Sequence, residues 1–441
     1  MDNHDLNIPD TAYKRIVILG AGFAGLNLAK NLRNSSYQVV LIDRNNFHQF
    51  QPLFYQVAMA GLEPSAIVFP IRKVFHSADN VFVRQAEILK VDHAENRVVT
   101  NNGVIEYDIL VVSLGAVTNF YGNEVVEKNS FSLKSLGQSL GIRNQIFTDF
   151  ERSMYEMDYH NRQSFIDFVI VGGGPTGVEM AGALAEMKRY IIPKDFPELN
   201  QDEIDIFLVQ SGTQLLPGMS HKSSRKAEKY LRDMGVLIVL NDRVEGYDGV
   251  HATLKSGRKI RTNKLIWAAG VKCPVITGIE AFYGEKTGRI SVDQSCRVLN
   301  TENMYAVGDI AGMTTVDYPK CHPQVAQVGI QMGDYLSRLL ITKQKGITLD
   351  RPFKYKNKGV MATIGRHKAV ADFPSFSMAG FISWVIWLWV HLFSLIGVRN
   401  KLFVVINWMW NYFSFDSSLR LIIQQESRLT DTTDAHDTLQ E

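Results

Sequence analysis

The chain has 441 residues, of which 46% are apolar and 21% charged, and its formal net charge is +2 at pH 7. This length allows two or three domains with separate cores, and the balanced charge gives no reason to expect nucleic-acid binding. The cysteines, Cys273, Cys296 and Cys321, form no C-x-x-C pair, which argues against a disulfide framework and against a metal site built from thiolates. Residues 1–14 resemble neither a secretory signal nor an Arg-rich transit peptide, so we expect synthesis in the cytoplasm.

The first predicted unit contains a glycine-rich turn between a strand and a helix. A strand at 15–19 leads into Gly20-Ala21-Gly22-Phe23-Ala24-Gly25, which opens a helix at 23–33, and a second strand follows at 37–42. In such a unit the glycines let the backbone approach a pyrophosphate at the positive end of the helix. Asp43 ends the second strand, where a carboxylate suits the ribose hydroxyls; a solvated strand end is the alternative.

The segments that follow connect this unit to the rest of the chain. A loop rich in aromatic residues and glutamine covers 47–56, and a short β stretch covers 81–99. A strand at 107–112 returns the chain to the first sheet, and residues 131–163 are predicted to form a helical connector.

A second unit of the same kind covers about 165–288. The strand at 168–171 leads into Gly172-Gly173-Gly174-Pro175-Thr176-Gly177, followed by a helix to 188 and a strand at 205–209. Gln210 ends that strand, where an NAD-preferring site usually has an acid that repels a 2′-phosphate. We therefore expect weak discrimination against NADPH. Two such motifs in one chain predict two dinucleotides that face each other.

A later strand pattern predicts that the first unit is discontinuous. Residues 304–309 end on Asp309, an acid that commonly bonds the ribityl chain of the flavin in two-dinucleotide flavoproteins; an ordinary Gly-Asp turn is the alternative. The prediction is an α/β fold with two Rossmann-like domains. Their expected ranges are 12–117 with 289–372 for FAD, 118–288 for NADH, 373–422 for a membrane-associated segment and 423–441 for a polar tail.

The C-terminal stretch is apolar and rich in tryptophan. Residues 373–398 contain no Asp, Glu, Lys or Arg, and five of the six tryptophans lie at positions 384, 387, 389, 408 and 410. A membrane-spanning helix needs about twenty apolar residues, so the length allows one. Tryptophan prefers the headgroup level, and Arg399, Lys401 and Arg420 can reach anionic lipids, which favours an anchor lying in one leaflet. A buried core or a dimer contact is the remaining alternative.

Together these strings resemble those of the type II NADH:quinone oxidoreductases, single-subunit flavoenzymes of respiratory membranes that pump no protons. The resemblance covers residues 14–422 and includes both glycine motifs. Its more specific strings are Gln51-Pro-Leu-Phe-Tyr-Gln56, Trp267-Ala-Ala-Gly-Val271, Ala306-Val-Gly-Asp309 and Ala326-Gln-Val-Gly-Ile-Gln331. It implies a fold of the glutathione-reductase type with FAD as cofactor and NADH as substrate.

The resemblance also implies roles for individual residues. Residues 20–25 would hold the FAD pyrophosphate, and the other expected flavin contacts are Asp43, Arg44, His48, the backbone near Ile88, Asp309, Ala326 and Gln327. Gln331 would line a quinone tunnel, and Glu179 would handle protons near the flavin; an acid favoured by the helix dipole is its alternative reading. The expected NADH contacts are Gly172, Gly174, Gly177, Gln210 and Gly270. Cys321-His322-Pro323-Gln324 departs from the family pattern and leaves the local tunnel shape open.

The function implied is electron transfer from NADH through FAD to a membrane quinone, either menaquinone or ubiquinone. The expected location is the cytoplasmic side of the cell inner membrane, bound to the lipid surface, and family analogy leaves a homodimer open. A flavin disulfide reductase is disfavoured because residues 44–60 contain no cysteine. A protein-reducing ferredoxin or rubredoxin reductase would not explain the tryptophan-rich end. A sulfide:quinone oxidoreductase and a non-enzymatic NADH-sensing flavoprotein remain the alternatives.

Overall fold

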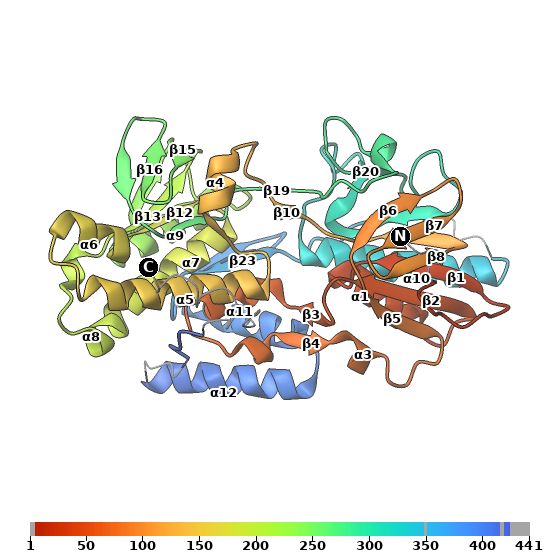
Figure 1. Cartoon of the computed structure of the whole chain (residues 1–441), viewed down its shortest axis with the longest axis horizontal. Coiled ribbons are helices and arrows are strands. Elements are labelled where there is room, and N and C mark those ends of the chain that lie inside the picture. Colours follow the sequence, from red (N-terminus) through yellow and green to blue (C-terminus); the bar gives the residue numbers. More distant parts are fainter. Residues whose placement is uncertain (1–4, 348–350, 415–418, 424–441) are drawn as a thin grey trace, which may run out of the picture.

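The computed structural model describes residues 5–347, 351–414 and 419–423. Two lobes lie side by side along the long axis of the molecule, and the last helix runs along the lower edge of the left-hand lobe (Figure 1). A five-stranded parallel sheet forms the centre of each lobe. The strands of both sheets are runs of β-branched and aliphatic residues, as expected where both faces of a parallel sheet are covered.

The first sheet combines strands from both ends of the chain. Its order is β21-β9-β1-β2-β5, with bounds Met304–Ala306, Ile109–Val112, Lys14–Leu19, Tyr37–Asp43 and Val81–Gln85. Helices α1 (Phe23–Leu32) and α10 (Ala326–Gln344) pack against each other in this lobe. The same core includes buried side chains of an antiparallel sheet, β6 (Ile88–Asp92), β7 (Arg97–Thr100) and β8 (Gly103–Glu106).

In the second sheet the order β18-β12-β13-β14 repeats the order β9-β1-β2-β5 of the first. The full order of the second sheet is β11-β18-β12-β13-β14, with bounds Phe131–Ser132, Leu265–Trp267, Phe168–Val171, Ile206–Gln210 and Leu237–Leu240. The predicted connector at 131–163 contains two helices, α5 (Leu136–Ser153) and α6 (Tyr159–Ile166). Helices α7 (Pro175–Tyr190), α8 (Ile192–Asp195) and α9 (His221–Asp233) belong to the same lobe, as does an antiparallel sheet of β15 (Val244–Tyr247), β16 (His251–Leu254) and β17 (Lys259–Arg261).

Two short strands join the lobes. β10 (Val117–Thr118) leaves the first lobe, β19 (Val271–Lys272) returns to it, and the two pair in antiparallel fashion. This arrangement supports insertion of the second unit into the first, although the expected domain boundaries themselves stay a prediction.

The long apolar run near the C-terminus is divided between strand and helix. An antiparallel sheet of β23 (Val360–Thr363), β24 (Ala369–Asp372) and β25 (Ser377–Gly380) precedes α11 (Phe381–Ser394) and α12 (Val398–Ser414). Gly380 and Gly397 have φ of +99° and +84°, so the chain turns sharply before each helix. Among the described residues, neither these helices nor any others combine the length and the apolarity needed to cross a membrane. Nearly all of the predicted tail at 423–441 lies outside the described residues.

Candidate functional site

The first glycine motif forms a tight turn at the carboxyl end of β1. Gly20 has φ of +97°, and a Cβ on Gly25 would lie 2.0 Å from the carbonyl oxygen of Gly20, so both positions require glycine. A Cβ on Gly22 would meet no protein atom within 4 Å. Helix α1 begins after Gly22 with no side-chain cap and no acid in its first turn, which leaves its amide groups available to an anion. This open, uncapped cradle fits a dinucleotide pyrophosphate.

The second motif repeats this geometry at the end of β12. Gly172 has φ of +109°, a Cβ on Gly177 would lie 1.9 Å from the Gly172 oxygen, and a Cβ on Gly174 would meet nothing within 4 Å. Helix α7 likewise begins without a side-chain cap and without an acid in its first turn. Gly270, with φ of +79°, lies near this unit, where a Cβ would collide with the hydroxyl of Tyr121.

The residues at the ends of β2 and β13 bond to these loops. Asp43 Oδ2 accepts a hydrogen bond of 2.7 Å from the backbone N–H of Ala21. Gln210 Oε1 accepts one of 2.9 Å from the backbone N–H of Gly173. The buried ring of His48 makes a 2.9 Å hydrogen bond through Nδ1 to the Ala21 oxygen and meets the Phe23 ring edge-on. Burial lowers the pKa of His48, so the ring is neutral at pH 7.

The turn that carries Asp309 packs onto the first glycine loop. A Cβ on Gly308 would lie 3.1 Å from the Cβ of Ala24, and a Cβ on Gly333 of α10 would lie 2.7 Å from the Ala24 oxygen. Burial raises the pKa of the Asp309 carboxyl, and the nearby cations Lys134 and Arg289 oppose that effect. The structure thus brings Asp309 and the start of α10, where Ala326 lies, to the loop expected to hold FAD.

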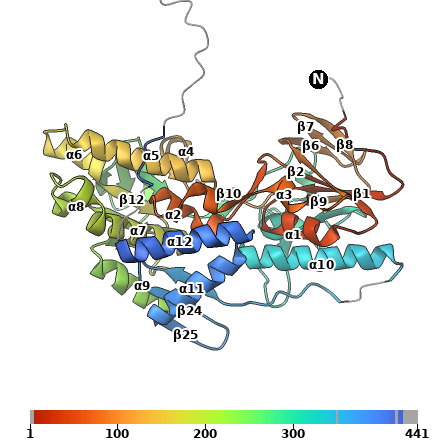
Figure 2. The same ribbon diagram turned by 90° about the horizontal axis from the view of Figure 1, so that it is seen from below.

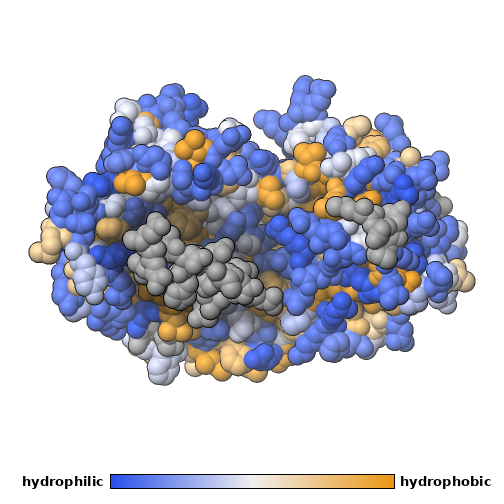
Figure 3. Space-filling view, in the orientation of Figure 1, coloured by the Kyte–Doolittle hydropathy of each residue, from blue (hydrophilic) through white to orange (hydrophobic). Residues whose placement is uncertain are grey.

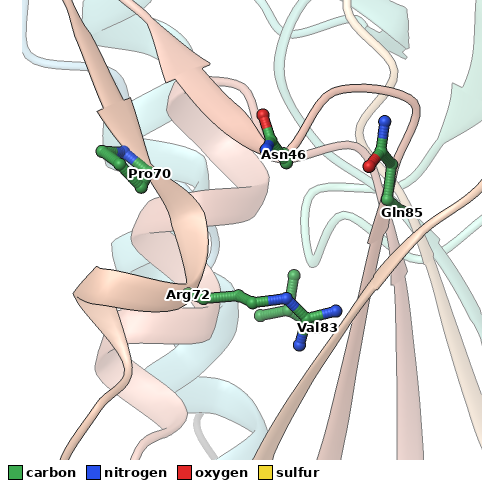
Figure 4. A pocket seen from close by; sticks show the side chains of 5 residues that line it. All are labelled: Asn46, Pro70, Arg72, Val83 and Gln85. Atoms are coloured by element: carbon green, nitrogen blue, oxygen red, sulfur yellow. The ribbon is translucent and has the colours of Figure 1, made fainter.

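Two other expected flavin contacts lie farther along the sheet edge. Arg44 is exposed, and its carbonyl oxygen accepts a 3.1 Å hydrogen bond from Gln85 Nε2; Ile88 begins β6 and packs against the core. A cavity of about 170 Å³ opens beside them, at the ends of β2 and β5. Figure 4 shows the residues that line it, with Arg72 of α3 (Ile71–Val74) directed toward Val83; the others are Asn46, Pro70 and Gln85.

A larger, mainly apolar cavity of about 560 Å³ lies between the second unit and the C-terminal helices. Its walls come from α2 (Phe54–Ala58), α7, the turn between β23 and β24, α11 and α12. These elements lie together in the view from below (Figure 2). Trp384, Trp387 and Trp408 face this cavity, so part of the tryptophan-rich stretch lines an internal space.

Glu179 of α7 is the predicted site residue that lines this cavity. Its side chain is buried, and Oε1 accepts a long hydrogen bond of 3.4 Å from the backbone N–H of Thr363. Burial raises the pKa of Glu179 to about 8, against the smaller opposing effects of the Thr363 N–H and the nearby Trp387 indole. Glu179 is therefore mostly protonated at pH 7. A carboxyl group whose only influence was the positive end of the helix dipole would instead have a lowered pKa.

Tyr55 and Gln56 contribute a hydrogen-bonded chain to the same wall. Trp408 Nε1 of α12 donates a 2.9 Å hydrogen bond to Gln56 Oε1, and Gln56 Nε2 donates one of 2.9 Å to the Tyr55 hydroxyl oxygen. Glu186 lies at the cavity as well, where burial raises its pKa and the cation of Arg366 opposes the shift.

The two glutamines of the A-Q-x-x-x-Q string lie outside the residues that line this cavity. Gln327 donates through Nε2 to the Gly359 oxygen at 2.9 Å, and Gln331 donates to the Lys356 oxygen at 3.0 Å. Each also accepts a backbone N–H from the same segment. They fasten the chain before β23 to α10, and their expected contacts with flavin and quinone stay predictions.

Sequence reasoning missed several residues of the cavity, although a signal was present. Tyr55 and Gln56 belong to a string used only to recognise the family. On α12, Val405, Trp408, Met409 and Tyr412 follow the spacing i, i+3, i+4, i+7, which indicates one buried helical face, and all four line the cavity.

The two parallel sheets with equivalent glycine loops define a pyridine nucleotide–disulphide oxidoreductase fold with two dinucleotide sites. The family model of that description matches residues 14–333, and the model described as the NDH2 C-terminal domain matches residues 357–414. The type II NADH:quinone oxidoreductase NdhA of Mycobacterium tuberculosis is 33% identical over 410 residues, covering 89% of this chain and 86% of that protein. The chain therefore belongs to the type II NADH:quinone oxidoreductase family.

Solved structures share the fold. The structure of NDH2 from Plasmodium falciparum in complex with NADH gives a TM-score of 0.84 at 20% identity, covering 93% of this chain and 100% of that one. The sulfide:quinone oxidoreductase of Aquifex aeolicus gives 0.70 at 17% identity, covering 93% and 96%. At such identities the likeness extends to the fold alone.

Proposed function

We propose that this chain is a flavoenzyme that passes electrons from NADH, through bound FAD, to a quinone in the large cavity. The observation that carries the proposal is an apolar cavity of about 560 Å³ that contains one buried, largely protonated carboxyl group, Glu179. A quinone needs an apolar pocket for its ring and a source of protons, and this cavity offers both. When bound, FAD would accept a hydride, which is two electrons and one proton, from NADH and pass the two electrons to the quinone.

The chain's own residues bind and orient the two nucleotides. Gly22 and Gly174 leave the room that each pyrophosphate requires, and the uncapped first turns of α1 and α7 supply N–H groups to it. Asp43 and Gln210 stand where each ribose would lie. Asp309 and the start of α10 would hold the flavin, and Gly270 would contact NADH; the space that a Cβ on Gly270 would need is occupied by the Tyr121 side chain.

A stopped-flow experiment tests the function directly. Adding NADH should bleach the flavin absorbance within the turnover time, and a water-soluble short-chain quinone should restore it. If quinone does not reoxidise the flavin while sulfide reduces it, the assignment is wrong and the sulfide enzyme is the better reading. The thiols argue against that alternative, because Cys273, Cys296 and Cys321 are all buried and burial raises the pKa of Cys273 to about 11.

We further propose that the outer faces of α11 and α12 lie on a membrane surface on the cytoplasmic side. Large apolar side chains are exposed there, among them Phe393, Leu402, Ile406 and Trp410, none of which lines the large cavity. Hydrophobic residues gather along the lower edge of the molecule, where α12 runs (Figure 3). Such a contiguous apolar face marks an interaction site, and Trp beside Arg399 and Lys401 suits the headgroup level.

Liposome flotation tests the membrane proposal. Replacing Ile406 and Trp410 with Glu should release the protein from vesicles of anionic phospholipid while flavin content stays unchanged. The matched control replaces Leu237 of β14, which is 40% exposed on another part of the molecule, and should float normally. Self-association through the same helices is the competing use of this face. If the Glu variants float normally but fall apart to monomers in sedimentation, the surface joins two chains and the membrane proposal fails.

A further inference from the structure

The wall of the large cavity contains a directional chain of hydrogen bonds that starts on α12. Trp408 Nε1 donates to Gln56 Oε1, and Gln56 Nε2 donates to the Tyr55 oxygen, each over 2.9 Å. Tyr55 is only 5% exposed, and the cavity is lined by all three residues. The chain therefore joins the C-terminal helix to a buried hydroxyl group at the proposed quinone site.

The chemistry of the three groups fixes the direction of the chain. An indole N–H only donates, so it holds the oxygen of the Gln56 amide toward α12 and turns the NH₂ group toward Tyr55. The Tyr55 oxygen thus accepts a hydrogen bond, and its own hydrogen must point elsewhere. Among the residues that the structure describes, the Tyr55 hydroxyl donates no hydrogen bond, and Tyr55 lines the cavity wall.

A buried donor without a partner is unfavourable, which indicates that a ligand supplies the acceptor. The carbonyl oxygens of a quinone accept hydrogen bonds and donate none. We propose that Tyr55 donates a hydrogen bond to one carbonyl oxygen of the quinone, and that Gln56 and Trp408 are positioning residues that orient its hydroxyl. This inference rests on the proposed function of the cavity.

The bond would matter most as electrons reach the quinone. Negative charge then develops on the carbonyl oxygen, and a donor already aimed at it stabilises that charge without reorganisation. Burial raises the pKa of Tyr55 well above its usual value, with the nearby Glu179 adding to the shift, so the hydroxyl keeps its hydrogen at neutral pH.

Two variants test the donor and its orientation separately. Tyr55→Phe keeps the ring and removes the hydroxyl, so kcat for quinone reduction should fall about 10²-fold, as for loss of one preorganised donor. Gln56→Glu keeps the bond to Trp408, but an ionised carboxylate only accepts and would capture the Tyr55 hydrogen. It should cause a similar loss although Tyr55 is intact. In both variants NADH should bleach the flavin at the wild-type rate.

A spectroscopic readout separates this role from a structural one. Infrared difference spectra of a ¹³C-carbonyl-labelled short-chain quinone in the oxidised enzyme should show a lowered C=O stretching frequency. In Tyr55→Phe and in Gln56→Glu that band should move toward its position in apolar solvent. The matched control is Tyr155→Phe, at a side chain that is 84% exposed, and it should change neither the rate nor the band.

The outcomes distinguish this inference from the proposed function. If quinone fails to reoxidise the wild-type flavin, the function itself fails. If quinone works normally and Tyr55→Phe retains the wild-type rate and band, the donor role of Tyr55 is overturned. If Tyr55→Phe is impaired while Gln56→Glu matches the wild type, the orienting role of Gln56 and Trp408 is overturned.

Discussion

Asp43 and Gln210 occupy equivalent places in the two nucleotide-binding units. Each ends the second strand of its sheet, and each accepts a hydrogen bond from the N–H of the second residue of its glycine motif, at 2.7 Å from Ala21 and 2.9 Å from Gly173. The geometry is repeated while the charge is not. The first unit presents a carboxylate beside the expected ribose, and the second presents a neutral amide.

This difference predicts nucleotide preference. The wild-type enzyme should favour NADH over NADPH by less than about a thousandfold in kcat/KM, which corresponds to roughly 4 kcal/mol. Gln210→Glu should raise that preference about tenfold to hundredfold, because a carboxylate repels the 2′-phosphate. Steady-state rates with NADH and with NADPH measure this preference. As a control, the flavin spectrum of Gln210→Glu should match that of the wild type. A wild-type preference above a thousandfold would contradict the hypothesis.

Glu179 predicts the pH dependence of the quinone half-reaction. Its pKa is raised from 4.5 to about 8, so the carboxyl holds its proton below pH 8 and loses it above. The rate of flavin reoxidation by quinone should fall as the pH rises from 7 to 9. Glu179→Gln should lower this rate about 10²-fold and remove that decline. Flavin bleaching by NADH, followed over the same pH range, is the control, and an unchanged decline in the variant would show that another group is responsible.

Gly22 and Gly25 should respond differently to the same substitution. Gly22→Ala puts a Cβ into space that no protein atom fills, so the protein should fold but bind FAD about tenfold more weakly or worse. In Gly25→Ala the Cβ would lie 2.0 Å from a backbone oxygen, and the free energy of unfolding should fall by about 3 kcal/mol. Urea unfolding and flavin titration separate the two effects. Equal FAD affinity in Gly22→Ala and wild type would place the pyrophosphate elsewhere.

A buried ion pair should stabilise the second unit. Lys264, the residue before β18, lies 3.1 Å from Asp149 of α5, and both side chains are almost fully buried. Lys264→Met leaves the Asp149 carboxylate without its cation, so the free energy of unfolding should fall by about 3–5 kcal/mol. Lys259→Met, at an exposed site in β17, should change it by less than about 0.5 kcal/mol. Chemical denaturation measures both, and equal stability of the two variants would refute the role of the pair.

The parts of the fold set by local sequence were predictable. Runs of β-branched residues predicted β1, β2, β9 and β12, and the glycine motifs predicted the turns after β1 and β12, because each depends on residues adjacent in the chain. The expected nucleotide contacts of these turns stay predictions. Gln210 was likewise identifiable from the sequence as a departure from the acid that usually ends this strand in an NAD-preferring site. In the structure it accepts a hydrogen bond from Gly173.

The cavity was not predictable in the same way, since its walls come from segments far apart in sequence. Asn411 is a polar residue within an apolar run, and Asn400 lies between Arg399 and Lys401. In the structure their side-chain amides donate 2.7 Å hydrogen bonds to the oxygens of Val68 and Gly61, so they fasten α12 to the body of the protein. A pattern of residue types does not reveal which backbone carbonyl a distant side chain will meet.

The assembly of the first sheet from both ends of the chain sets an order for biosynthesis. The strand β21 and the helix α10, which packs on α1 through the 2.6 Å hydrogen bond from Asn27 to Asp334, are synthesised after the whole second unit. On the ribosome the glycine loop and the parallel sheet of the second unit are therefore made before the first sheet has all of its strands. A chain that stops before Ala326 would contain the second glycine loop but lack α10, which packs against α1 beside the loop expected to hold FAD.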